Sequence, residues 1–200
     1  MMLPTHALVG LAVAAPLAIA MPELGSVALG GALVGSLLPD MDLYSGHRRT
    51  LHYPTGYVFL AGLAVLVAGV LATPAAVAAA FLFVGAAVHC RMDRYGGGLE
   101  LRPWEGTSER AVYDHVLGRW RTPKRWVRYD GAPEDLLLAA LLGAPLLIVL
   151  GAPFRWVVAG ALLVAGVYTL LRRRLATLAP TVFGRVPDPI GQYVPDRYRQ

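Results

Sequence analysis

The chain has 200 residues, of which 56% are hydrophobic and 16% charged, with a mean hydropathy of +0.52. Ordinary soluble domains carry roughly 25% charged residues, so this composition excludes a typical soluble protein. The apolar residues gather in long runs that lack the alternating pattern of a membrane barrel, which predicts an all-α, polytopic helical protein in the lipid bilayer. The formal net charge of +5 does not by itself indicate nucleic acid, because membrane proteins concentrate Lys and Arg on their cytoplasmic side.

Six apolar runs approach the length of about 20 residues that a membrane-crossing helix needs. They cover residues 7–21, 24–38, 56–71, 74–89, 136–150 and 154–171 and predict three hairpins. The first run also resembles a signal peptide, because a small-residue triplet at 18–20 imitates a cleavage site. No Lys or Arg precedes that run, so a retained span is expected. Gly31 and Gly35 give the second run a small-residue face for close helix packing.

The connections between the runs alternate between very short and long polar segments. With six spans, both termini and both long loops share one side, which carries 17 of the 18 Lys and Arg residues; Arg155 is the exception. The excess of positive charge predicts that this side is cytoplasmic in a multi-pass protein of the cell membrane. We therefore expect one transmembrane domain over 1–175, a long cytoplasmic loop over 91–134, and an extended or loosely ordered tail over 176–200.

The long loop contains a basic and aromatic stretch. Ser108 and Glu109 are typical of a helix start, and Val112, Val116 and Trp120 then recur at helical spacing. Arg and Lys residues surround the aromatic side chains, a composition suited to an amphipathic helix at the lipid headgroups. Nucleic acid is the competing partner for such a patch, but it is not expected beside several membrane spans.

Histidines and acids occur where the apolar runs end. His6 enters the first run, Asp40 and Asp42 follow Pro39 at the end of the second, and His47 and His52 lie in the loop that follows. His89 and Asp93 are four residues apart at the end of the fourth run, which puts both on one helix face. Each group taken alone has a simpler explanation as a helix cap or an interfacial residue. Hairpin folding would bring all seven to one level at the membrane, where such groups are usually kept for a function.

The chemistry of these side chains indicates a metal site. Imidazole and carboxylate together favour a divalent transition metal, with Zn first and Mn or Fe as alternatives, as one ion or two. Arg48, beside His47, would suit an anionic group of a substrate. His115 and Asp114 lie in the basic stretch, and His115 is expected on the face of the amphipathic helix.

The ordered set of His6, Pro39-Asp40-x-Asp42, His47-Arg48 with His52, and His89-x-x-x-Asp93 between hydrophobic runs resembles the YdjM-like, LexA-regulated, membrane-bound metal-dependent hydrolases of the inner membrane. The resemblance covers roughly the first hundred residues. The family pattern in the loop is H-R-G-x-T-H-S; here the spacing of the histidines is kept, while Leu51 and Tyr53 replace the threonine and the serine. The resemblance implies a divalent metal and a hydrolytic activity.

Three functional hypotheses follow. The leading one is a hydrolase at the cytoplasmic interface that acts on an amphiphilic phosphoester. Its metal ligands would be His6, Asp40, His89 and Asp93, with His47 and His52 next. Asp42 would bridge metals or act as general base, and Arg48 would bind the substrate anion. The alternatives are a protein that translocates metal ions or protons and a membrane scaffold with a structural metal. Transport sites usually lie near the bilayer midplane, whereas these groups lie at helix ends.

Overall fold

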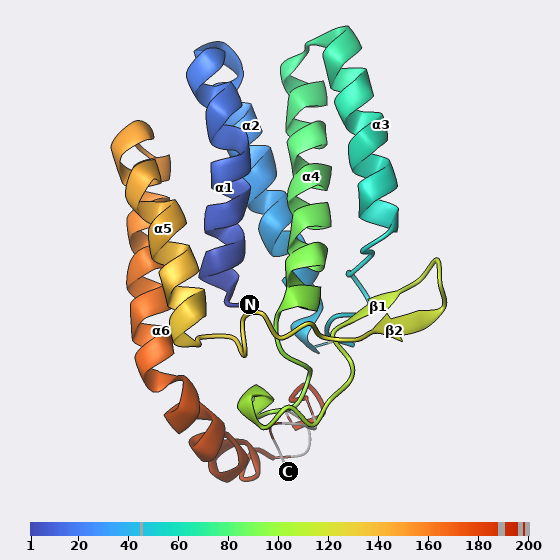
Figure 1. The fold of residues 1–200 in the computed structure, drawn as a ribbon, viewed down its shortest axis with the longest axis vertical. Coiled ribbons are helices and arrows are strands. Elements are labelled where there is room, and N and C mark those ends of the chain that lie inside the picture. Colours follow the sequence, from blue (N-terminus) through green and yellow to red (C-terminus); the bar gives the residue numbers. More distant parts are fainter. Residues whose placement is uncertain (45, 188–190, 196–197, 199–200) are drawn as a thin grey trace.

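The computed structural model describes residues 1–44, 46–187, 191–195 and 198, and its helices stand side by side with the long loops at one end (Figure 1). The α-helices are α1 (Leu3–Ala20), α2 (Pro22–Leu37), α3 (Gly56–Leu71), α4 (Pro74–Tyr95), α5 (Pro133–Val149) and α6 (Phe154–Phe183). Two 3-10 helices, η1 (Leu38–Tyr44) and η2 (Pro103–Glu105), and the strands β1 (Val112–Asp114) and β2 (Arg119–Arg121) complete the elements.

Proline and short turns set the hairpins that the sequence predicts. A proline occupies the first turn of α1, α2, α4 and α5, where its missing N–H costs no helical hydrogen bond. Ala72 ends α3 in the left-handed conformation (φ 50°), and the Oγ of Thr73 then accepts the N–H of Ala76 to begin α4. These tight turns reverse the direction of the chain within a few residues, so the two outer ends of each hairpin lie at the same level.

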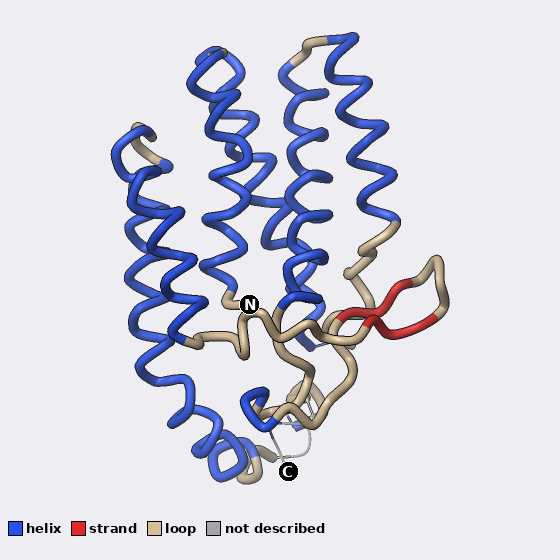
Figure 2. The backbone as a smooth tube through the Cα atoms, in the orientation of Figure 1, coloured by secondary structure: helices blue, strands red, loops and turns tan. Residues whose placement is uncertain are grey.

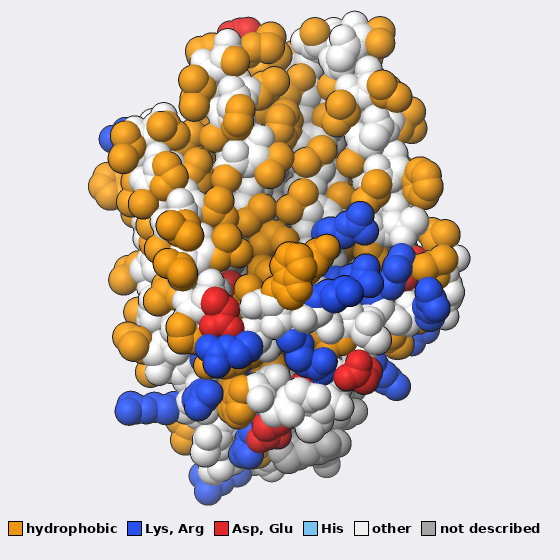
Figure 3. All heavy atoms as spheres, viewed as in Figure 1, with side chains coloured by type: hydrophobic (Ala, Val, Ile, Leu, Met, Phe, Trp, Pro, Cys, Tyr) orange, Lys and Arg blue, Asp and Glu red, His pale blue; other side chains and the backbone are white. Residues whose placement is uncertain are grey.

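The all-α membrane architecture is confirmed. Among the described residues, four helical stretches are long and apolar enough to cross a bilayer: Leu3–Ala20, Pro22–Leu43, Pro74–Tyr95 and Phe154–Phe183. The helices α3 and α5 have 16 and 17 residues, so the count of six spans stays a prediction. Hydrophobic side chains cover the helices, and Lys and Arg side chains gather toward the end that carries the loops (Figure 3).

Small residues bring α2 against α4, as predicted for Gly31 and Gly35. A Cβ added to Gly31 would lie 3.1 Å from the carbonyl carbon of Ala78, and one added to Gly35 would lie 2.7 Å from the carbonyl carbon of Leu82. Both distances are shorter than an ordinary van der Waals contact, so only glycine allows the two backbones to approach this closely. The contact fixes the end of α2 beside the end of α4.

The predicted amphipathic helix in the long loop is wrong. Residues 112–121 form an antiparallel hairpin instead, in which Tyr113 lies opposite Trp120 with ring centroids 5.5 Å apart (Figure 2). Gly118 turns the chain with φ at 63°, and the buried Asp114 accepts the N–H of Val116. Aromatic cross-strand pairs and a glycine at positive φ favour a hairpin, and here they outweigh the helical spacing of the apolar residues.

The extended or loosely ordered tail was predicted to begin at residue 176, which is too early. The last helix does not stop at 171 but continues to Phe183, and Ala176 and Ala179 are buried on one of its faces. The apolar spacing of Leu175, Ala176 and Ala179 keeps the helical period beyond the arginines, which explains the extension. The loop end of the molecule is therefore flanked by a helix that projects past the bundle.

Candidate metal centre

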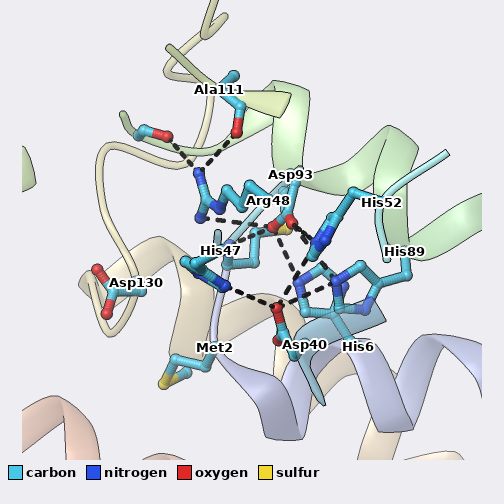
Figure 4. A network of polar contacts seen from close by, with 12 residues as sticks. Met2, His6, Asp40, His47, Arg48, His52, His89, Asp93, Ala111 and Asp130 are labelled. Atoms are coloured by element: carbon cyan, nitrogen blue, oxygen red, sulfur yellow. Dashed lines mark hydrogen bonds and ion pairs between the residues drawn. The ribbon is translucent and has the colours of Figure 1, made fainter. Parts of the chain in front are cut away.

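All the predicted site residues lie together at the loop end of the bundle; Figure 4 labels them except for Asp42, which contacts His47 and His52. His6 comes from the first turns of α1, Asp40 and Asp42 from η1, and His89 and Asp93 from the last turns of α4. The loop between η1 and α3 supplies His47, Arg48 and His52. Four short elements from distant parts of the chain thus meet at one level.

Four of these side chains form a compact ligand set: Asp40, His52, His89 and Asp93, with one ligand atom of each within 4.8 Å of the other three. The Nε2 of His52 lies 3.2 Å from Asp93 Oδ2 and 3.7 Å from Asp40 Oδ1. The Nε2 of His89 lies 3.4 Å from the same Oδ2 and 3.4 Å from the same Oδ1. Ligands bound tetrahedrally at about 2.0–2.1 Å are separated by about 3.3–3.4 Å, so this spacing fits one transition-metal ion.

The ring of His89 is held so that its Nε2 faces the acids. Its Nδ1 lies 2.6 Å from the carbonyl oxygen of Ser36 and must donate to it, since a carbonyl only accepts. In the neutral ring Nε2 then carries a lone pair, and this buried atom has no hydrogen-bond partner among the described residues. Because Nε2 lies 3.4 Å from a carboxylate oxygen of both Asp40 and Asp93, either a proton on Nε2 or a metal ion must separate this nitrogen from the two negative charges, and the spacing of the four ligand atoms fits a metal ion.

His52 is oriented by a carboxylate. Its Nδ1 lies 2.9 Å from Oδ2 of Asp42, which leaves Nε2 directed at the ligand set. Asp42 also accepts the backbone N–H groups of Arg48 and Leu51 and lies 3.1 Å from Nδ1 of His47. A buried carboxylate with this many donors is typical of the residue that orients a metal-binding imidazole. Burial lowers the pKa of His52, but its contacts with Asp42 and Asp93 outweigh burial and raise it.

The two oxygens of Asp93 face different partners. Oδ2 faces the imidazoles of His52 and His89, whereas Oδ1 lies 3.2 Å from Nε2 of His6 and 3.5 Å from the guanidinium of Arg48. The ring of His6 stacks on that of His89 with centroids 3.8 Å apart, and its buried Nδ1 has no hydrogen-bond partner among the described residues. His6 therefore lies beside the four-residue set rather than within it.

Arg48 ties the site to the long loop. Its side chain is buried and donates to the carbonyl oxygens of Gly97 (2.9 Å) and Ala111 (3.4 Å), and its own carbonyl accepts the N–H of Tyr113. Burial lowers the pKa of Arg48, but the charge of Asp93 outweighs it and raises the pKa, so the side chain stays charged. The long loop thereby covers the side of the site on which Arg48 lies, called its polar side below.

Exposure within the ligand set is uneven. The side chain of Asp40 is 22% exposed, whereas those of His52, His89 and Asp93 are at most 1% exposed. His47, 4.0 Å from Asp40 through Nδ1, is 17% exposed. Asp40 and His47 therefore form the open side of the centre.

Two residues that support the site, Ser36 and Asp135, were not predicted from the sequence, and His115 lies in another place than predicted. The carbonyl of Ser36 has no side-chain signature, so only the fold reveals its bond to His89. Asp135 is fully buried in the first turn of α5 and accepts the Thr5 hydroxyl at 2.7 Å, which anchors the helix that carries His6. The sequence signal that could have identified Asp135 is an acidic residue at the start of an apolar run. His115 lies in the hairpin and not on the predicted helix, and its Nε2 is hydrogen-bonded to the carbonyl oxygen of Arg49.

Comparison with known proteins identifies a family. No curated protein and no solved structure matches the chain significantly. A family model described as "YdjM inner membrane protein" matches residues 1–176, which include all the site residues, all of α1–α5 and most of α6. With the helical membrane fold and the ligand set in place, this match shows that the chain belongs to the YdjM inner membrane protein family.

Proposed function

We propose that this membrane protein is a metal-dependent hydrolase that acts on an amphiphilic phosphoester at the cytoplasmic face of the membrane. The observation that carries the proposal is the buried Nε2 of His89, which points at two carboxylates without a hydrogen-bond partner among the described residues. A structural zinc site is usually closed by four protein ligands, whereas a hydrolytic site needs an accessible side. With four protein ligands here, the water would take a fifth position on the ion, and the partial exposure of Asp40 leaves that side accessible to it.

In this proposal Asp40, His52, His89 and Asp93 hold a divalent transition metal, with zinc favoured by the mixed nitrogen and oxygen donors and manganese or iron as alternatives. When bound, the metal supplies Lewis acidity that polarises a phosphoester and activates water. His6, stacked on His89, could contribute to a second ion. The remaining functional groups act by orienting these ligands and handling protons.

We assign three roles to the surrounding residues. Asp42 positions His52 and His47, because its carboxylate already accepts from both rings and from two backbone N–H groups. His47 lies on the open side of the site, and Asp42 holds its Nδ1. Its Nε2 would transfer a proton to or from the substrate during hydrolysis. Arg48 fixes Asp93 and adds positive charge near the phosphoester.

The cytoplasmic orientation follows from charge. Of the 18 Lys and Arg residues in the sequence, all but Arg155 fall in the segments expected on one side of the membrane, the side of the site, and the positive-inside rule favours the cytoplasm for that side. The substrate would then come from the inner leaflet or from the cytoplasm. An enzyme at this interface meets a phosphoester where lipid headgroups lie.

Hydrolysis of phosphoester lipids in detergent micelles tests the proposal. The purified, metal-loaded protein should release phosphate or a phosphorylated headgroup, and a chelator should abolish the release. His89→Ala and Asp40→Asn should each lower the rate by about 100-fold or more, the loss typical of a disrupted metal site. His115→Ala, outside the ligand set, is the matched control and should keep the rate. Equal rates in the wild type and His89→Ala would contradict the proposal.

A further inference from the structure

A large apolar cavity lies beside the metal centre, between the first turns of α1, the end of α2 with η1, and α6. Its volume is about 600 Å³, within the range of small-molecule sites. Its lining is mainly aliphatic, including Leu3, Leu37, Val157 and Val164, and Asp40 and His47 belong to the same lining. The open side of the metal centre therefore faces an apolar cavity.

The cavity also lies between helices that are long and apolar enough to cross a bilayer. Leu3 is 46% exposed and Val164 is 54% exposed on helices that can cross the bilayer, so the cavity has an apolar margin on the outer surface of the bundle. The polar side of the centre is covered by the long loop through Arg48, Gly97 and Ala111. A molecule that approaches Asp40 through this cavity thus passes along hydrocarbon-like surface.

The dimensions suit a hydrocarbon chain. On α6 the lining follows one helix face from Val157 through Gly160, Ala161 and Val164 to Tyr168. These 11 residue steps at about 1.5 Å each extend about 16 Å, close to half of the hydrocarbon thickness of about 30 Å. The cavity therefore runs for about the depth of one leaflet.

From this geometry we infer that the cavity between α1, η1 and α6 binds the acyl chain of a membrane phospholipid and holds its phosphoester at Asp40 and His47. The inference rests on the proposed function and specifies its substrate as a long-chain lipid that enters sideways from the bilayer. A water-soluble phosphoester would leave the apolar lining uncovered and would gain nothing from it. The lining thereby selects substrates by their chains.

Gly160 offers a clean way to test the cavity. It belongs to the lining, and a Cβ added there meets nothing within 4 Å, so a larger side chain can begin at this position without a clash and extend over the lining face. Gly166, on the same helix, is also open at its Cβ and is not among the cavity residues. Gly160→Leu and Gly166→Leu are therefore a matched pair of variants.

Native mass spectrometry in detergent, with added dioleoyl or dihexanoyl phosphatidic acid, measures chain binding without any need for turnover. The wild type and Gly166→Leu should each retain one dioleoyl lipid, and Gly160→Leu should retain it roughly tenfold more weakly, equivalent to about two methylene groups left unburied. Dihexanoyl lipid should bind weakly to all three. Metal content, measured on the same samples, should be unchanged and reports an intact fold.

The outcomes separate the two proposals. Equal dioleoyl retention in Gly160→Leu and the wild type, or retention of dihexanoyl lipid as strong as that of dioleoyl lipid, would overturn the acyl-chain site whatever the activity. A second copy of the chain seated on this face, seen as a dimer in the wild type and a monomer in Gly160→Leu, would overturn it as well. Selective chain binding in a protein that hydrolyses no phosphoester would support the cavity assignment and refute only the proposed function.

Discussion

Replacement of Gly35 by alanine tests whether the contact between α2 and α4 sets the geometry of the metal centre. The new Cβ would lie 2.7 Å from the carbonyl carbon of Leu82 and closer still to its carbonyl oxygen, whereas ordinary contact begins at 3.4 Å, so the helices must separate by at least about 0.7 Å. Asp40 follows α2, and His89 follows Leu82 on α4 by about two turns. Metal–ligand distances tolerate deviations of about 0.2 Å, so a shift of this size should prevent both residues from binding one ion.

The assay is the metal content of detergent-purified protein, together with its thermal unfolding. Gly35→Ala should lose most of its metal and be destabilised by about 1–3 kcal/mol, the usual cost of overpacking. Gly30→Ala is the matched control, because a Cβ at Gly30 of the same helix meets nothing within 4 Å, and it should keep both metal and stability. Full metal occupancy in Gly35→Ala would refute the reasoning that helix spacing controls the site.

Three further predictions concern the surroundings of the site. Asp42→Asn should weaken metal binding by about 10–100-fold without abolishing it, because it disturbs the orientation of an imidazole; unchanged affinity in a metal titration would contradict the role of Asp42. Arg172 lowers the pKa of Asp130 although burial opposes it, so this ion pair stabilises the fold above the ordinary carboxyl pKa, and its contribution disappears as the pH falls through the lowered value. Asp130→Asn should therefore lower the unfolding temperature at pH 7 and reduce its loss on acidification; an unchanged pH dependence would exclude the pair as the cause. In intact cells an impermeant thiol reagent should label Glu23→Cys, in the first turn of α2, but not Val116→Cys in the hairpin, and the reverse pattern would overturn the orientation.

Much of the fold follows from local sequence properties. Run length and proline positions predict the hairpins, because a membrane helix must satisfy its own backbone hydrogen bonds and can turn only outside the hydrocarbon. The convergence of His6, His52, His89 and Asp93 then follows, since each lies at the same end of a hairpin. The glycines of α2 were also identifiable as a packing face from their spacing alone.

The rest depends on contacts that have no local signature. The helical spacing of Val112, Val116 and Trp120 predicted a helix, but the pairing of Tyr113 with Trp120 produces a hairpin. Spacing along the chain also could not separate direct ligands from orienting residues. Asp40 and Asp42 are equivalent in sequence, and only the 3-10 turn of η1 directs one toward the imidazole Nε2 atoms and the other toward Nδ1 of His52.

The different partners of the two carboxylate oxygens of Asp93 also have no local sequence signature. The sequence pairs Asp93 with His89 on a helix face, and the structure adds His6, Arg48 and His52 from other elements. A carboxylate surrounded in this way needs its neighbours in place before it can orient a ligand atom. Such a network depends on tertiary structure, which the spacing of these residues along the chain does not show.

Elemental analysis of the purified protein after expression in metal-supplemented medium shows whether the site binds a metal. About one transition-metal ion per wild-type chain is expected, since one four-residue ligand set is present among the described residues. The double variant His52→Ala/His89→Ala should be free of metal, whereas His115→Ala should keep it. A wild-type protein without transition metal, or a double variant with the wild-type content, would contradict the existence of this site.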